Sequence, residues 1–423
     1  MKHGWSSRGR TIPAALISAV ADLRGTSPVL MSTSHLPPIL NGAITVAWFS
    51  ASLWLAMMLI AFLIHLARRH SRDSTSPTGV KKLIIQITTI GDDIIIDTVR
   101  RLRAALDRRD NPVFEIWVVT EPSDPRSYPF VDRVLVVPAD FETSQHTKFK
   151  GRAHEYARLD RLRSGLTGYK VLYIDDDSTV SPDFVDECYD QSFDLLQGVV
   201  TIGRPLGVLS HLDASVRAMS CLSLCSFFQE LSHHLFTHGE GFCIDEQVDR
   251  AVSWDHPGWY AEDLVYGALA TRRWGFRMRS TYATVQTNSP ISIRQFIKQR
   301  RRWFWAFAKS SYLLPTSARI ELWGFAILGL LITPLAVSGM LLAGLGIFHL
   351  PATLAVASRV LFVLWIATWG FSGYFSQRKV QGIVVGAASA MVAPTVGFVA
   401  TIVSILMGPV QTFEVMRRVE GHG

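Results

Sequence analysis

Three consecutive carboxylates, Asp175, Asp176 and Asp177, directly follow the apolar segment YKVLYI at residues 169–174. Adjacent carboxylates repel one another and are costly to bury, so the triplet is unfavourable in a structural core. Hard divalent cations take oxygen ligands, and Mg²⁺ is typically held by carboxylates together with substrate phosphates. An extended backbone directs Asp175 and Asp177 to one face. We predict that these two residues bind Mg²⁺ or Mn²⁺; a solvated acidic turn is the alternative.

The pair Glu262-Asp263 is a second acidic signal, at the start of the helical segment EDLVYGALATRRW. Carboxylates are favoured at a helix start by the helix dipole and by capping, and capping alone is one interpretation. The functional interpretation is general base catalysis, in which a carboxylate accepts the proton of a hydroxyl nucleophile. We assign the base to Asp263 and expect Glu262 to position loops or substrate.

The segment QRRRW at residues 299–303 is a third signal. Arg302 is a candidate to neutralise a departing diphosphate, because fixed positive charge stabilises charge that develops on phosphate oxygens. Trp303 offers an apolar face to a sugar ring or to the membrane interface. For Arg300 and Arg301 the simplest expectation is contact with lipid headgroups.

Alternating strand and helix patterns must position these residues. Strands are predicted at LIIQITTI, FEIWVVT, VDRVLVVP and YKVLYI, and helices at residues 98–110 and 154–165. Such alternation favours an α/β layer with a mostly parallel sheet, whose ligands lie at the carboxyl ends of the strands. The acidic triplet stands at such a strand end.

Apolar segments flank this region. Residues 41–68 form a predicted transmembrane helix, because 44–66 hold no charged residue and cross a hydrocarbon core of about 30 Å. Residues 291–315 predict an amphipathic interface helix, and 320–408 about three further spans. Arg68, Arg69 and Arg72 predict that the chain after the first span is cytoplasmic, whereas Arg417 and Arg418 argue against the implied side of the C-terminus. Residues 1–40 and 409–423 are tails.

Composition supports this division. The 423 residues are 48% hydrophobic and carry a net charge of +7, which suits a membrane protein with a cytoplasmic face towards anionic lipids. No nucleic-acid-binding motif is present. The four cysteines form no CxxC pair, so we expect reduced thiols in a cytosolic domain.

Together these motifs resemble family 2 glycosyltransferases of the GT-A fold, in the integral-membrane branch with cellulose, chitin and hyaluronan synthases. The likeness covers residues 81–305 and is greatest to egghead-type β-1,4-mannosyltransferases, through the segments TTIGDD, FKGRAHEYA, YIDDDS, HGEGFCI and SWDHPGW. It implies an α/β GT-A-type nucleotide-sugar-binding domain at residues 79–290, cytoplasmic and inserted between α-helical transmembrane segments of a multi-pass membrane protein.

The resemblance also implies roles for single residues. The nucleotide-sugar would contact Asp176 and the residues that match the family's base pocket and basic pair, namely Thr88, Thr89, Glu121, Lys150 and Arg152. Glu121 stands where the family usually has Asp, which leaves the nucleotide base open. The diphosphate or acceptor would contact Gln299, Arg302 and Trp303, together with the glycine-bearing loop and a tryptophan before the acidic pair, namely Gly239, Glu240, Gly241 and Trp254.

The implied reaction is a single displacement that inverts the donor linkage and forms a β-glycosidic bond. A sugar would move from GDP-mannose or a UDP-sugar to a lipid-linked or saccharide acceptor, with Mg²⁺ or Mn²⁺ on Asp175 and Asp177. A processive β-polysaccharide synthase is the alternative enzyme, and a transporter or sugar-binding partner is the non-enzymatic one. The sequence does not fix the donor, the acceptor or the oligomeric state.

Overall fold

The computed structural model describes residues 38–69, 80–91, 93–107, 114–190, 193–203, 205, 207–230, 237–257, 261–334, 337 and 352–409. The chain divides into two units, Met1–Thr45 and Val46–Gly423. In the first unit, Pro38–Thr45 are helical and begin helix α2 (Pro38–Arg69). The predictions on Arg72, Arg417 and Arg418 and on most of both tails lie outside the described residues.

An eight-stranded sheet forms the centre of the second unit, in the order β3-β2-β1-β4-β7-β6-β8-β5. Among the described strands, the β3-β2-β1-β4 block and the β6-β8 pair are parallel, while β7 is antiparallel to both neighbours and β5 to β8. The sheet is therefore mixed rather than mostly parallel. The strands are β1 (Lys82–Thr88), β2 (Phe114–Thr120), β3 (Arg133–Val136), β4 (Tyr169–Asp175), β5 (Thr179–Val180), β6 (Leu195–Ile202), β7 (Phe242–Asp245) and β8 (Met278–Thr287).

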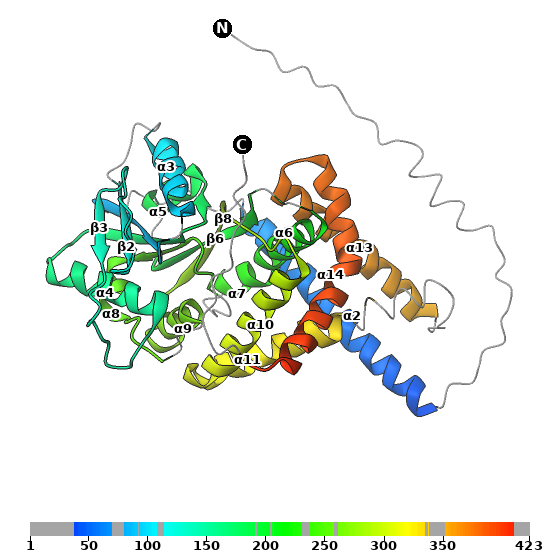
Figure 1. Cartoon of the computed structure of the whole chain (residues 1–423). Helices are drawn as coiled ribbons and strands as arrows, with labels where there is room; N and C mark the ends of the chain where they lie inside the picture. The colour runs from blue at the N-terminus through cyan, green and yellow to red at the C-terminus, as the bar shows by residue number, and fades with distance from the viewer. Residues whose placement is uncertain are drawn as a thin grey trace, which may run out of the picture. The chain divides into compact units, whose positions relative to one another are not determined.

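Helices cover both faces of the sheet, as Figure 1 shows. Side chains alternate along β1, so Leu83, Ile85 and Ile87 pack on one face while Ile84 packs on the other. The first face carries α3 (Ile94–Leu106) and α5 (Pro182–Asp190). The second carries α4 (Phe149–Arg163), α8 (Glu246–Ala251) and α9 (Glu262–Ala268).

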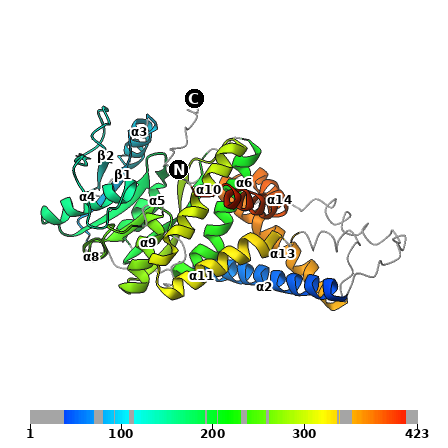
Figure 2. The same ribbon diagram turned by 60° about the horizontal axis from the view of Figure 1, so that its bottom comes forward.

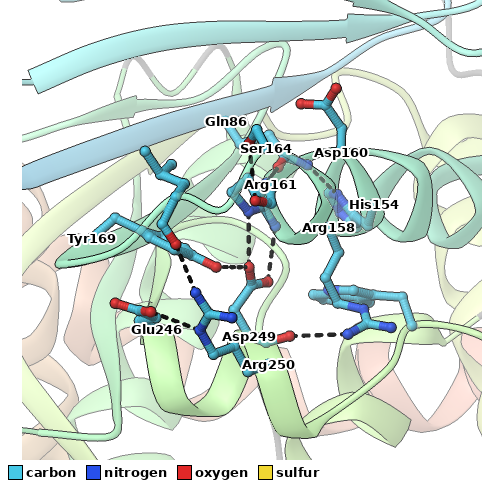
Figure 3. Close-up of polar contacts among 12 residues, drawn as sticks. Gln86, His154, Arg158, Asp160, Arg161, Ser164, Tyr169, Glu246, Asp249 and Arg250 are labelled. Carbon is cyan, nitrogen blue, oxygen red and sulfur yellow. Dashed lines mark hydrogen bonds and ion pairs between the residues drawn. The ribbon is translucent and has the colours of Figure 1, made fainter.

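A buried ion pair fastens α4 to α8 beneath the sheet (Figure 3). Arg161 and Asp249 are fully buried, and two guanidinium nitrogens of Arg161 each lie 2.8 Å from a carboxylate oxygen of Asp249. Arg161 also donates to Gln86 Oε1 at 2.6 Å, and the Tyr169 hydroxyl donates to Asp249 at 2.8 Å. The charges are therefore both paired and hydrogen-bonded, which is the condition for burying them.

A second group of helices lies beside the sheet (Figure 1). It comprises α6 (Val208–Ser220), a π-helical segment Cys221–Cys225, α7 (Ser226–Glu230), α10 (Ile293–Ser310), α11 (Thr316–Ile327), α13 (Ala352–Gln377) and α14 (Val380–Leu406). Helix α14 packs against both α6 and α10 (Figure 2). Trp54 of α2 contacts Phe325 of α11 edge to face, with ring centroids 5.3 Å apart.

Glycines allow α13 and α14 to pack backbone to backbone. A Cβ at Gly373 would collide with the carbonyl oxygen of Gly382, and one at Gly386 with that of Trp369. Small residues at such crossings are typical of helices that pair in lipid. Among the described residues, Val380–Leu406 is the one helix that is long and apolar enough to span a membrane, and Ser52–Ile64 is a shorter apolar stretch. The multi-pass arrangement stays a prediction.

Candidate active site

One cavity of about 990 Å³ connects the carboxyl ends of the sheet strands with the second group of helices. The parallel register aligns Thr88 of β1 with Asp175 of β4, so both side chains reach the same edge of the sheet. The cavity lining passes from these residues to Glu262 and Asp263 and then to the helices. Its mouth reaches the surface near Ile90, which is 52% exposed.

Carboxylates and one lysine occupy the sheet end of the cavity. Lys150, in the first turn of α4, forms an ion pair with Asp175. Glu262 and Asp263 begin α9, as the sequence predicts, and both face the cavity. The backbone N–H groups of Gly239 and Leu264 donate to the two carboxylate oxygens of Asp263, at 2.7 and 2.8 Å. These two bonds fix the orientation of the carboxylate.

Burial sets the proton affinities of this cluster. Loss of hydration raises the pKa of Asp263, and it raises the pKa of Glu262 to about 7, with the neighbouring Asp263 charge as the next cause. Lys150 opposes both shifts, and the surrounding carboxylates raise its own pKa although burial acts in the opposite direction. A carboxylate with a raised pKa beside a cavity is suited to accept a proton near neutral pH.

The predicted nucleotide-binding residues lie together on the same wall. Thr88, Thr89, Asp176, Glu121 and Arg152 all line the cavity. The Thr89 hydroxyl donates to Asp176 at 2.9 Å, and Arg152 pairs with Glu121 at 2.5 Å. Hydrogen-bond donors and acceptors therefore surround one space, and their assignment to a nucleotide-sugar stays a prediction.

The predicted metal ligands are not equivalent in the structure. Asp175 and Asp176 line the cavity, whereas Asp177 is not among its lining residues. The part of the chain that the structure describes holds no group of three His, Cys, Asp or Glu residues suited to a metal ion. Carboxylates at the cavity fit a hard cation that also takes phosphate oxygens from the substrate. The assignment of Asp175 and Asp177 to Mg²⁺ or Mn²⁺ remains a prediction.

The glycine loop contributes backbone to the site. Gly239 and Glu240 line the cavity, and a Cβ at Gly239 would lie 2.9 Å from Lys150 Nζ. Gly241 has φ +74°, and a Cβ there would collide with Val285. Only glycine adopts this conformation without strain. Gly239 therefore permits close approach at the site, while Gly241 shapes the turn into β7.

The arginines of QRRRW have separate roles. Arg302 and Trp303 line the cavity, and their predicted contact with diphosphate or acceptor stays a prediction. Arg300 also lines the cavity, and its guanidinium bonds to the buried Asp213 of α6 at 2.5 Å, so it does not face lipid headgroups as expected. Arg301 donates to the carbonyl oxygens of Met407, Gly408 and Pro409 at the end of α14. A cation at a helix C-terminus satisfies carbonyls that lack helical partners.

Two predicted acceptor contacts are core residues instead. Trp254 is 1% exposed and stacks on Tyr266 with ring centroids 3.9 Å apart. Gln299 is 4% exposed, and neither residue is among those that line the cavity. The sequence pattern placed them near the chemistry along the chain, but their side chains point into packed interior.

Sequence reasoning missed Asp213 and Arg217 of α6. Arg217 bonds to Asp213 at 3.1 Å and to Glu240 at 3.2 Å, and both arginines, Arg217 and Arg300, lie over the ring of Trp303 at 5.1 and 4.6 Å from its centroid. The network thus holds the predicted Glu240 and Trp303 together. The signal that could have found it is the charged pair at positions i and i+4 of a helix that is otherwise apolar and small.

Sequence comparisons found related proteins. Residues 170–376 match the model of the family described as glycosyl transferase family group 2. The β-1,4-mannosyltransferase egh of Drosophila melanogaster is 24% identical over 286 residues, 64% of this chain and 62% of the relative. The chain thus spans somewhat less than two thirds of that relative's length.

Two solved structures are similar at lower identity. The mannosyltransferase PcManGT of Pyrobaculum calidifontis, in complex with GDP-Man and Mn²⁺, is 16% identical, with 84% of this chain and 98% of that chain covered and a TM-score of 0.46. The glucosyl-3-phosphoglycerate synthase of Mycobacterium tuberculosis, with Mn²⁺ and UDP-glucose, is 13% identical, with 56% and 81% covered and a TM-score of 0.35.

Over residues 170–376 the chain resembles family 2 glycosyltransferases. This finding favours the enzyme over the transporter and sugar-binding alternatives. The matched residues 170–376 include the carboxylates Asp175, Glu262 and Asp263 and the QRRRW segment. The donor, the acceptor, the metal and the membrane topology go beyond the match.

Proposed function

We propose that this chain is an inverting, metal-dependent membrane glycosyltransferase of the GT-A type that moves a hexose from a nucleotide-sugar to a lipid-linked acceptor. The observation that carries the proposal is the continuity of the cavity. Its sheet end holds the carboxylates and basic residues. Its far end is lined by apolar and aromatic side chains of α2, α11, the π-helical segment Leu328–Ile332, α13 and α14, among them Trp54, Phe325, Leu330, Trp365 and Trp369.

The apolar end favours a lipid over a growing polysaccharide. Sugar hydroxyls need hydrogen-bond partners, and a buried polar group without one is costly. In the described part of this end, Thr333 and Thr401 are the hydroxyl-bearing side chains in the lining, and Thr333 already donates to the carbonyl of Leu328 at 3.0 Å. A hydrocarbon chain needs no such partners, and its burial is favourable in proportion to its apolar area.

The chain's own residues then divide the work. Asp263, oriented by two backbone N–H groups, accepts the proton of the acceptor hydroxyl, which attacks the anomeric carbon from the face opposite the leaving group. Arg302 offsets negative charge on the departing nucleoside diphosphate. Mg²⁺ or Mn²⁺ held by Asp175 and Asp177 would add charge stabilisation at the diphosphate. An α-linked donor gives a β-glycoside.

The membrane placement is part of the proposal. Helix α14 meets the length and hydropathy of a span, and the paired glycines of α13 and α14 suit helix packing in lipid. Basic residues after the first apolar helix favour a cytoplasmic catalytic domain. Protease digestion of sealed inside-out vesicles should remove the sheet domain, and digestion of right-side-out vesicles should spare it.

A donor screen tests the activity. Purified full-length protein with Mn²⁺ and a total lipid extract is incubated with radiolabelled GDP-mannose or UDP-sugars, and both nucleoside diphosphate release and product mass are measured. We expect one discrete glycolipid from one donor, and GDP-mannose is the first donor to test because of the likeness to mannosyltransferases. A ladder of long chains would instead support the processive synthase.

A further inference from the structure

The protein contains two pairs of neighbouring cysteines in contrasting surroundings. Cys188 and Cys243 are both 0% exposed and lie within the hydrophobic core on the α3 face of the sheet. Cys221 and Cys225 flank the π-helical segment after α6, and both line the substrate cavity. None of the four forms a disulfide. Cys188 and Cys243 are therefore enclosed by the core, whereas Cys221 and Cys225 can contact a molecule that enters the cavity.

A histidine accompanies the cavity pair. The Sγ atom of Cys221 lies 3.6 Å from Nε2 of His238, which also lines the cavity. His238 precedes Gly239, whose N–H donates to the candidate base Asp263. The backbone N–H of His238 in turn donates to Gln197 Oε1 at 2.9 Å, which holds the main chain at this residue.

The electrostatics of this group favour the thiolate. A hydrogen bond from Cys225 is the largest cause that lowers the pKa of Cys221, and the His238 charge also contributes. The pKa of His238 is raised to about 9, by Cys221 first and then by Glu240 and Asp263, against the opposite effect of burial. Burial and the neighbouring Cys243 instead raise the pKa of Cys188. Thiolates, not thiols, are the nucleophilic form of cysteine.

We propose that Cys221 is a nucleophilic modification site, which opens into the substrate cavity and takes soft electrophiles and low-molecular-weight disulfides. The geometry that supports it is the cavity-lining position of the sulfur, the imidazole at 3.6 Å and the second thiol one turn away. The proposal does not depend on the identity of the donor or of the acceptor.

The proposed reactions of Cys221 are thiol–disulfide exchange and alkylation. With a disulfide R–S–S–R, the Cys221 sulfur forms a bond to one sulfur, the R–S–S–R bond breaks, and R–S⁻ leaves and takes a proton from solvent. The product is a mixed disulfide on Cys221. With iodoacetamide, a sulfur–carbon bond forms and iodide leaves. Either adduct would occupy the cavity between the carboxylates and the apolar end, so modification should inhibit transfer.

The test is the labelling rate of each cysteine in the folded full-length protein. The protein in detergent is treated with a limiting amount of iodoacetamide at neutral pH, and peptide mass spectrometry follows the four cysteines separately. We expect Cys221 to react more than about tenfold faster than Cys188, because thiolate fraction and access set the rate. Similar slow labelling of all four would overturn the proposal without any variant.

Variants sharpen the result. His238→Gln should slow labelling of Cys221 about tenfold if the imidazole stabilises the thiolate, and a rate unchanged in a folded variant would contradict that role. Cys188→Ser is the matched control, and its Cys221 labelling should equal that of the unmodified protein. Oxidised glutathione should form an adduct on Cys221 that a reductant removes. The same treatment should inhibit the unmodified protein, whereas the Cys221→Ser variant should be as active after the treatment as before it. Equal inhibition of both would refute the site.

Discussion

Arg161 and Lys150 of helix α4 meet very different surroundings. Arg161, near the end of the helix, donates to Asp249 and Gln86 (Figure 3). It also donates to the Tyr173 hydroxyl, so its charge is paired and its donors are taken. Lys150, in the first turn, pairs with Asp175 beside the cavity, and the charges of Glu262 and Asp263 lie nearby. The first cluster is closed by protein groups, whereas the second borders space that a substrate can enter.

The difference shows what burial of charge achieves in each place. A closed pair with good geometry fixes the elements that it joins, here α4, α8 and β4, and has no reason to change on binding. An open cluster has carboxylates whose pKa is raised by burial, and a bound substrate can replace one protein contact with another. We therefore expect changes in the open cluster to affect catalysis and changes in the closed cluster to affect stability.

The largest effect is expected for the candidate base. Asp263→Asn should lower the turnover of sugar transfer by about 10²- to 10⁴-fold, because the amide cannot accept the acceptor proton, although its Oδ1 can still accept one of the two backbone hydrogen bonds. Thermal unfolding should change little. Nucleoside diphosphate release and a melting curve measure both, and unchanged transfer would remove Asp263 from the mechanism.

Substitutions in the closed cluster around Arg161 should lower stability and leave donor binding nearly unchanged. Arg161→Met leaves Asp249 buried without its partner, which typically costs about 3–5 kcal/mol of unfolding free energy. Donor affinity of the folded fraction should stay near that of the parent. The double variant Arg161→Met with Asp249→Leu should regain part of the loss, because it removes the uncompensated charge. Denaturant unfolding tests both, and a single variant as stable as the parent would show that the pair is dispensable.

Two glycines of the loop before β7 should separate an effect on activity from an effect on stability. Gly239→Ala places a Cβ 2.9 Å from Lys150 Nζ and 3.3 Å from Asp263 Oδ2, so we expect about a tenfold loss of activity from misplaced groups, with little loss of stability. Gly241→Ala meets both φ +74° and Val285, so it should destabilise the fold. Comparison of kcat with melting temperature separates the two, and identical behaviour of both variants would contradict the distinction.

The pH dependence of the open cluster should reveal its burial. The base acts when deprotonated, so kcat/KM should rise with pH through a pKa above the usual carboxylate range. Glu240 raises the pKa of Asp263, so Glu240→Gln should move this rising limb to lower pH by less than about one unit. A limb that stays in place would show that Glu240 is not electrostatically coupled to the base.

The smallest effect is expected for an ion pair outside both clusters. Asp97 and Arg101 pair on the surface of α3 with exposed fractions of 54% and 61%. Asp97→Ala should change unfolding free energy by less than about 0.5 kcal/mol, because solvent screens exposed pairs. A melting curve of this variant gives the stability change expected for an exposed pair. A larger loss of stability would mean that the loss expected for Arg161→Met does not arise from burial.

Much of the site could be predicted from local pattern. The short apolar runs along residues 82–88 and 169–175 predict buried strands, and parallel pairing then brings Thr88 beside Asp175. The start of a helix at Glu262 follows from its acidic first turn. The strand order was harder to predict from the sequence, because antiparallel β7 lies between β4 and β6 and pairs with residues far away in the chain.

Long-range partners could not be predicted in the same way. Arg300 and Arg301 are neighbours with the same charge, yet one bonds to Asp213 of α6 and the other to the end of α14. Periodicity indicates which face of a helix is polar but not what that face meets. Trp254 illustrates the converse, since its aromatic neighbours come from β4 and α9 rather than from the segment around it.

The class of chemistry, the residues that carry its charges and the apolar segments on either side of them follow from the order of residues in the chain. These properties depend on residue type and on spacing within one element, which the chain specifies locally. The folded chain is needed to show which charged groups are enclosed by protein and which border the cavity, that the cavity continues into the helices, and that Cys221 contacts His238. Those properties depend on contacts between elements, and packing of the whole chain sets them.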